Sequence, residues 1–243
     1  MFKWKFFCFF LFLILAPLFL YGSQDSLRWH DRISFSALGG GAIPQAGLSQ
    51  KYDGTALSYS FSLGYQVSLR HYTYVDLTIG GHRLARYRNI FPVQSPQGGL
   101  FDLNHTTRSN LMNFQLGATH EFDQLWYVIP RISFSFGVVN GYVYTSLKDN
   151  FTNEMIDSYR ESNDWSYLTA ISGGLNIPII PGLHISILST YYRAGSMDLF
   201  LPRTQELLPS PVDPFDNLEL RRTASHLLSF QIGVTLYFYH LPH

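Results

Sequence analysis

The sequence predicts an all-β protein, an eight-stranded antiparallel up-and-down transmembrane β-barrel, on three observations. Charged residues make up only 14% of the 243 residues and aromatic residues 16%, whereas an ordinary soluble domain carries about 25% charged residues. The mean hydropathy of +0.01 is too low for a bundle of membrane helices. The third observation is a period-two alternation of apolar and small polar residues, which is the pattern of a strand with one apolar and one polar face.

The clearest strand pattern lies at 57–69, where every odd position is apolar and every even position is Ser, Gly or Gln. The segment 228–238 repeats the alternation with the apolar residues at even positions. The same pattern predicts six further strands, at 33–38, 75–79, 112–122, 128–138, 165–177 and 183–191. Together these segments give the eight strands of the predicted barrel.

The predicted connections alternate in length. Short turns are expected at 70–71, 123–125 and 179–181, and long loops near 44–55, 89–108, 146–163 and 200–222. Outer-membrane barrels have short periplasmic turns and longer extracellular loops. A soluble lipocalin-type barrel is the alternative, and it would turn its apolar face inward around a ligand. The opposite face is rich in Ser, Gly, Gln and Asn, which cannot form such a core, so the pattern favours the membrane.

Aromatic residues gather at the strand ends, where membrane barrels carry girdles at both interfaces. The expected outer girdle consists of Tyr142, Tyr144, Trp165, Tyr167 and Tyr191, and the periplasmic girdle of Phe122, Trp126 and Phe238.

The N-terminus predicts secretion. Lys3 and Lys5 precede an apolar run at 6–21, and the small residues Gly22 and Ser23 follow it. This order indicates a cleaved signal peptide at 1–22, because the run is shorter than the roughly 20 residues of a spanning helix. We expect a short periplasmic segment at 23–30 and the barrel at 31–240. The only cysteine, Cys8, lies in the apolar run, so the mature chain is expected to have no thiol, disulfide or Cys metal site. No other metal site and no cofactor are expected.

With these features the chain resembles the small eight-stranded outer-membrane proteins of Gram-negative bacteria, a group that includes the transmembrane domain of outer membrane protein A and the generic outer-membrane β-barrel families. The resemblance implies localisation in the outer membrane. The last strand looks like the C-terminal signal that this family presents to the barrel assembly machinery, although residues 239–243 follow Phe238 where the family often ends. Lys+Arg and Asp+Glu both number 17, so nucleic acid is excluded as a partner.

Strand parity predicts which side chains face the lumen. Six ionisable residues fall on the inward face near the short-turn end, and charges in a narrow barrel are tolerated chiefly when paired. We therefore expect a salt-bridged lumen plug formed by Arg32, Arg70, Asp76, Glu121, Arg131 and His184. Beyond the plug the inward residues are mostly small. They either pack the interior or leave a wet cavity that opens outward as a narrow gated channel.

The outer ends of the strands predict contacts with lipid and protein. Candidate lipopolysaccharide contacts are Arg83, Arg86, Arg88, Arg193, Arg221 and Arg222, because guanidinium groups bind phosphate well. The long loops carry apolar residues, and exposed apolar patches usually contact something. Candidate contacts with another outer-membrane protein are Phe91, Phe101, Leu208 and Phe215.

We expect a structural or binding role without enzymatic activity. The alternatives are a lipid A-modifying barrel enzyme and a narrow gated channel. An enzyme would need a His, a Ser nucleophile and an acid in contact. His226 and Ser229 are three residues apart in a strand and so point to opposite faces. His120 is adjacent to Glu121, and His82 has no Ser and acid beside it in the sequence.

Overall fold

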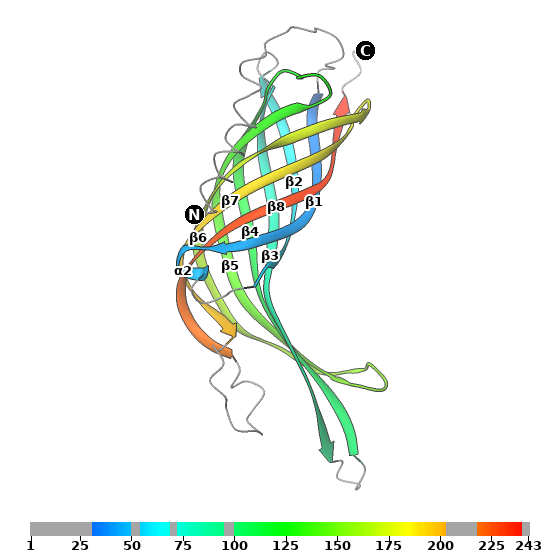
Figure 1. Cartoon of the computed structure of the whole chain (residues 1–243), viewed down its shortest axis with the longest axis vertical. Helices are drawn as coiled ribbons and strands as arrows, with labels where there is room; N and C mark the ends of the chain where they lie inside the picture. Colours follow the sequence, from blue (N-terminus) through cyan, green and yellow to red (C-terminus); the bar gives the residue numbers. More distant parts are fainter. Residues whose placement is uncertain (1–30, 50–53, 69–71, 95–99, 203–217, 240–243) are drawn as a thin grey trace, which may run out of the picture.

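A computed structural model of the chain describes residues 31–49, 54–68, 72–94, 100–202 and 218–239. Eight strands form one closed antiparallel barrel in which consecutive strands pair and β1 closes the ring against β8 (Figure 1). They are β1 (Asp31–Gln45), β2 (Ala56–Ser68), β3 (Thr73–Gln94), β4 (Leu100–Glu121), β5 (Ile129–Asp149), β6 (Met155–Ile180), β7 (Leu183–Pro202) and β8 (Leu218–Tyr239). The predicted eight-stranded up-and-down architecture is confirmed.

Both described short turns reverse the chain at residues with left-handed backbone. Leu125 and Val128 exchange two backbone hydrogen bonds, of 2.8 and 3.0 Å, and Trp126 between them has a φ of 56°. The chain therefore turns at residues 126–127, just after the predicted 123–125. Between β6 and β7 it turns at residues 181–182, where Gly182 has a φ of 82°. The predicted turn at 70–71 lies outside the described residues.

The predicted long loops are wrong in extent, because the strands continue into them. The loop predicted at 89–108 is mostly hairpin, since β3 runs to Gln94 and β4 begins at Leu100. The loop at 146–163 reduces to residues 150–154 between β5 and β6, and β7 and β8 enter the loop at 200–222 from both sides. The predicted loop at 44–55 contains the end of β1 and the four-residue helix α2 (Ala46–Ser49).

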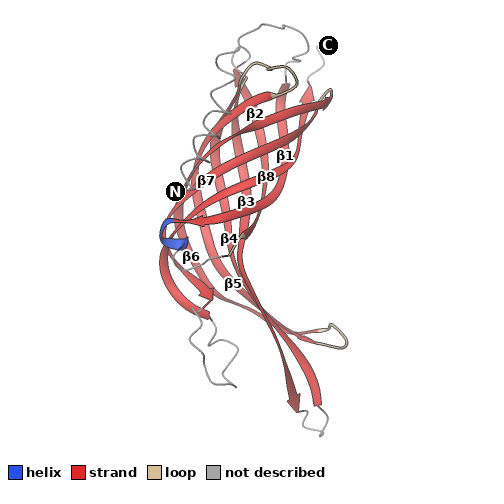
Figure 2. Ribbon diagram, viewed as in Figure 1, coloured by secondary structure: helices blue, strands red, loops and turns tan. Residues whose placement is uncertain are grey.

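The physical reason for this error is the loss of the apolar face. Period-two patterning marks a strand only where one face meets an apolar environment, whereas backbone pairing continues wherever a neighbouring strand is available. Beyond the apolar part of the barrel, β3 with β4 and β5 with β6 therefore form projecting hairpins, seen at the lower right of Figure 2.

The predicted signal peptide at 1–22 and periplasmic segment at 23–30 lie outside the described residues. Within the described ranges, the chain has no helix whose length and apolarity would let it cross a membrane.

Candidate functional site

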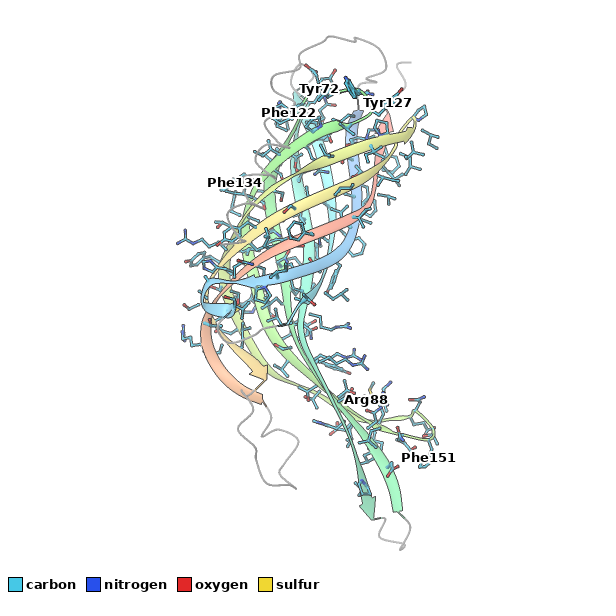
Figure 3. All side chains as sticks on the ribbon, viewed as in Figure 1. Tyr72, Arg88, Phe122, Tyr127, Phe134 and Phe151 are labelled. Carbon is cyan, nitrogen blue, oxygen red and sulfur yellow. The ribbon has the colours of Figure 1, made fainter. Side chains whose placement is uncertain are left out.

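The outward face of the barrel is an exposed apolar belt. On β2 the odd residues from Leu57 to Val67 are all apolar and all exposed, whereas the even residues from Ser58 to Gln66 are buried or half-buried. The belt continues on the other strands, and Figure 3 shows Phe134 pointing away from the barrel. Backbone groups cannot be left unpaired in a bilayer, so only helices and closed barrels span one. A closed ring with an apolar exterior meets that requirement.

Aromatic residues stand at both ends of the belt, as the sequence predicts. Phe122, Trp126 and Phe238 are exposed at the short-turn end, and Figure 3 shows Tyr72, Phe122 and Tyr127 together there. Trp165, Tyr167 and Tyr191 are exposed towards the long-loop end, and Tyr142 and Tyr144 are half-buried on the same outward face of β5.

The lumen near the short turns holds a buried hydrogen-bond network around Glu121. The hydroxyl group of Tyr237 donates to Glu121 Oε1 at 2.5 Å, and Asn176 Nδ2 donates to the same oxygen at 2.7 Å. Asn176 Nδ2 also lies 2.8 Å from the Tyr237 hydroxyl oxygen. Ser186 donates to Asn176 Oδ1 at 2.7 Å and pairs with Thr235 at 2.6 Å. The network therefore joins β4, β6, β7 and β8 across the lumen.

Four of the six predicted plug residues meet at this network. Arg131 pairs in register with Glu121 and acts electrostatically on Asp76 and on Tyr237. Thr119 hydrogen-bonds the carboxyl group of Asp76. The ring of His184 lies 4.6 Å from the ring of Tyr237, centroid to centroid.

The other two plug residues have no described side chains. Arg70 lies outside the described residues, and Arg32 belongs to β1 but only its backbone is described. Sequence reasoning did not single out Asn176, Ser186 or Tyr237 for the plug. Strand parity was the signal that could have found them, because all three lie on inward faces.

A small polar cavity lies next to the plug. Its volume is about 40 Å³, and its lining includes Asp76, Arg131, Gln115, Ser135 and Thr190. A buried water needs roughly 10–15 Å³ measured in this way, so the cavity has room for a few water molecules. Leu38, Leu188 and Tyr192 also line it.

The outer half of the lumen is filled by an apolar seal. Its buried members are Ala42, Leu48, Ala56, Leu84, Leu111, Val139, Leu168, Ala170, Tyr192, Ala194, Met197, Leu199 and Leu227. Leu48 enters from α2 and is fully buried. A Cβ on Gly141 of β5 would lie 2.8 Å from Leu199 and 3.2 Å from Met197, so β7 leans against β5 across the mouth.

Of the two alternatives for the inward residues, this seal favours a packed interior over a wet cavity that opens outward. The small inward residues surround the polar cavity, and the apolar seal lies beyond them together with buried polar residues such as His82 and Asn140. The sequence carries a weak signal for the seal in Leu227 and Leu228, where apolar residues occupy both faces of one strand. Within the seal, His82 is buried against Tyr192, with ring centroids 4.8 Å apart, and neither of its ring nitrogens has a hydrogen-bond partner among the described residues.

The outward arginines divide into separate groups. Arg86 and Arg108 are directly opposite each other on β3 and β4, and Arg83 and Arg86 both act electrostatically on Arg108. We call Arg83, Arg86 and Arg108 the arginine cluster. Arg108 was not among the predicted contacts, because the strand register that places it opposite Arg86 is a tertiary feature. Like charges on opposed strands are unfavourable unless an anion joins them.

The remaining candidate arginines do not join the cluster. Arg88 is exposed on β3 and donates from Nε to Asn104 Oδ1 at 3.0 Å. Arg193 on β7 and Arg222 on β8 are exposed, and Arg222 is opposite Asp198. Arg221 lies in β8 without a described side chain.

The predicted loop contacts are not placed by the structure. Phe91 and Phe101 belong to β3 and β4 but their side chains are not described, and Leu208 and Phe215 lie outside the described residues.

The tip of the β5–β6 hairpin has a defined turn. The backbone N–H groups of Thr152 and Phe151 donate to Asp149 Oδ1 at 2.9 and 2.7 Å. These bonds stabilise the carboxylate and lower the pKa of Asp149.

Two of the three histidines considered for catalysis, His226 and His120, have other hydrogen-bond partners. His226 Nδ1 lies 2.9 Å from the hydroxyl oxygen of Tyr191, while Ser229 donates to Ser58 inside the barrel. His120 Nδ1 lies 3.1 Å from the hydroxyl oxygen of Thr73. No hydrogen bond between described residues joins one of these histidines to both a serine and an acid.

No family profile matches the chain, and no curated protein matches it in sequence. Three solved structures illustrate what it is similar to. Neisserial surface protein A is 12% identical, with a TM-score of 0.47, over 85% of this chain and 97% of that protein. A major outer membrane protein from Thermus thermophilus is 10% identical, with a TM-score of 0.46, over 85% and 98%. The attachment invasion locus protein Ail of Yersinia pestis is 11% identical, with a TM-score of 0.37, over 87% and 100%.

The functional class follows from the geometry. A single antiparallel chain with an even number of strands, a closed ring, an apolar exterior and aromatic girdles has the construction of outer-membrane barrels. The chain is an outer-membrane β-barrel protein.

Proposed function

We propose that this protein is a non-conducting, non-enzymatic outer-membrane barrel with a binding role carried by its outer hairpins. The proposal rests on a contrast between the lumen of the barrel and the outer hairpins. The lumen is occupied by the hydrogen-bond network around Glu121 and by the apolar seal, whereas the β3–β4 and β5–β6 hairpins extend beyond the barrel. A barrel of eight strands leaves little room beyond its own side chains.

The first test measures conductance in planar bilayers. The unchanged barrel is expected to show no conductance steps. Replacing Leu84 and Leu199 by Ser should hydrate the seal. Leak currents are expected only when the plug is opened in the same protein, for example by Asp76→Ala. Steps from the unchanged barrel would contradict the proposal and favour the narrow channel.

We propose lipopolysaccharide as one ligand, with its phosphate groups on the arginine cluster. Arginine pairs with phosphate through two parallel hydrogen bonds, and each such bond to a charged group contributes about 1.5–3 kcal/mol. Arg83 and Arg108 each have an Nε atom without a hydrogen-bond partner among the described residues. The outward tyrosine Tyr59 lies within electrostatic range of Arg83, at the level where the outer girdle meets the lipid headgroups.

Binding of lipopolysaccharide with and without lipid A phosphates tests this ligand. Replacing Arg83, Arg86 and Arg108 by Gln should weaken binding of the phosphorylated form and leave the dephosphorylated form unaffected. Lys148→Gln is the matched control, because Lys148 lies on β5 and is neither in the arginine cluster nor a candidate contact. Equal binding by all variants would refute the assignment.

The lipid A-modifying enzyme remains the alternative in a different functional class. Mass spectrometry of lipid A from cells that overproduce the protein separates the two. The binding proposal expects an unchanged lipid A mass, and a gained or lost acyl chain would replace it by the enzyme.

A further inference from the structure

The outer hairpins form a sheet with two free edges. Beyond the barrel, β3, β4, β5 and β6 stay paired in that order. Pairing between β2 and β3 reaches only Arg83, and pairing between β6 and β7 begins only at Leu168. Within the described part of the chain, residues 84–94 of β3 and 155–163 of β6 therefore have a strand partner on one side only. Figure 1 shows this sheet leaving the barrel.

Both edges are accessible where side chains are described. On β3, Arg86, Arg88 and Ile90 are exposed, and Figure 3 shows Arg88 on the projecting hairpin. On β6, all side chains from Met155 to Ser158 are exposed. Unpaired backbone groups at such an edge can pair with another strand, and proteins normally block long edges for that reason.

The two edges belong to hairpins of opposite charge. Residues 84–110 carry Arg86, Arg88 and Arg108 against Asp102, a net charge of +2. Residues 144–163 carry Asp149, Glu154, Asp157 and Glu161 against Lys148 and Arg160, a net charge of −2. Pairing of two β3 edges would bring like charges together, and so would pairing of two β6 edges. Pairing of a β3 edge with a β6 edge joins opposite charges.

The membrane fixes the direction of this pairing. β3 runs from the short-turn end to the outer tip, and β6 runs from the outer tip back to the short-turn end. Two copies inserted in the same orientation therefore present β3 of one and β6 of the other as antiparallel neighbours. Both copies then turn the same face of the sheet to the same side. Backbone hydrogen bonding can therefore continue from one copy to the next without rotation of either barrel.

We propose that copies of this protein associate side by side, with the β3 edge of one copy pairing with the β6 edge of the next. The contact is head-to-tail, so it produces rows or closed rings of barrels in the membrane plane. Pro92 lacks a backbone N–H group, and it limits the pairing on β3 to the residues that precede it. The inference concerns contacts between copies and holds whether or not the arginine cluster binds lipopolysaccharide.

The test uses disulfide crosslinking of two single-cysteine proteins in bilayers, in a Cys8→Ser background. One protein carries Arg88→Cys and the other Asp157→Cys. Mixed and oxidised, they should give a several-fold larger dimer fraction than either protein alone. A mixture of Arg193→Cys and Asp157→Cys is the matched control, because Arg193 is exposed but lies on neither edge.

Exchanging the charges of the two edges provides a second test of the contact, and it needs no cysteine there. Rows measured by single-molecule fluorescence in supported bilayers should disappear when Arg86 and Arg88 become Glu. They should return when Glu154 and Asp157 of the same chain become Arg, because the two edges are again opposite in charge.

Three outcomes would overturn the proposal. The first is crosslinking of the mixture at the level of the Arg193 control. The second is equal crosslinking of either single variant with itself, which would indicate a symmetric contact. The third is crosslinking only to a different protein in native membranes and never between copies in bilayers, which would assign the free edges to that protein.

Discussion

Removing one hydroxyl group from the plug network should measurably destabilise the barrel. In the change Tyr237→Phe the ring remains and only the hydroxyl group is lost. That group donates to Glu121 Oε1 at 2.5 Å and accepts from Asn176 Nδ2 at 2.8 Å. Both partners are buried, so water cannot readily replace the lost bonds.

The magnitude follows from these two bonds. A hydrogen bond to a charged group contributes about 1.5–3 kcal/mol and a neutral one about 1 kcal/mol. Asn176 keeps its own 2.7 Å bond to Glu121, so the neutral bond is only partly lost. We expect Tyr237→Phe to lower the free energy of unfolding by about 2–4 kcal/mol.

Equilibrium urea unfolding of the barrel in lipid vesicles, followed by tryptophan fluorescence, measures the change. Tyr127→Phe is the control, because Tyr127 is 82% exposed at the tip of a turn, and it should alter stability by less than about 0.5 kcal/mol. Combining Tyr237→Phe with Glu121→Gln should give a coupling energy above about 0.5 kcal/mol. If Tyr237→Phe falls within the range of the control, the network does not stabilise the barrel.

Three further predictions concern separate parts of the molecule. Gly137→Ala should strongly reduce the assembled fraction in refolding assays, because its Cβ would overlap the carbonyl oxygen of Phe114, whereas Gly39→Ala meets nothing within 4 Å and should refold normally. Equal refolding of both would contradict the close approach. The carboxyl group of Asp149 should titrate by NMR below its ordinary pKa of 3.8, so the turn is held above that pH and loosens as the pH falls through the lowered value. Asp149→Asn should remove this pH dependence. An ordinary pKa measured for Asp149 in the unchanged protein would refute the prediction. Asp76→Ala should reduce urea stability, and it should raise conductance when Leu84 and Leu199 are also replaced by Ser; no change in either would refute the plug.

The sequence was sufficient to predict the strands that cross the membrane. Segments such as 57–69 face lipid on one side and a narrow lumen on the other, so the two environments impose alternation on the sequence itself. The inward parity of Asp76, Glu121, Arg131 and His184 follows from the same rule, and the structure places all four around one network. Their role as a plug remains a prediction.

Tertiary structure alone decided what lies beyond the apolar belt. Where both faces of a strand meet water or protein, no alternation is required, and the hairpins of β3–β4 and β5–β6 leave no period-two signal. Two features depend on contacts between residues distant in sequence. One is the strand register that places Arg86 opposite Arg108, and the other is the packing of Met197 and Leu199 across the mouth. The sequence by itself determined the membrane barrel because a bilayer acts on each strand separately, while the seal, the arginine cluster and the free edges required the strands to be brought together.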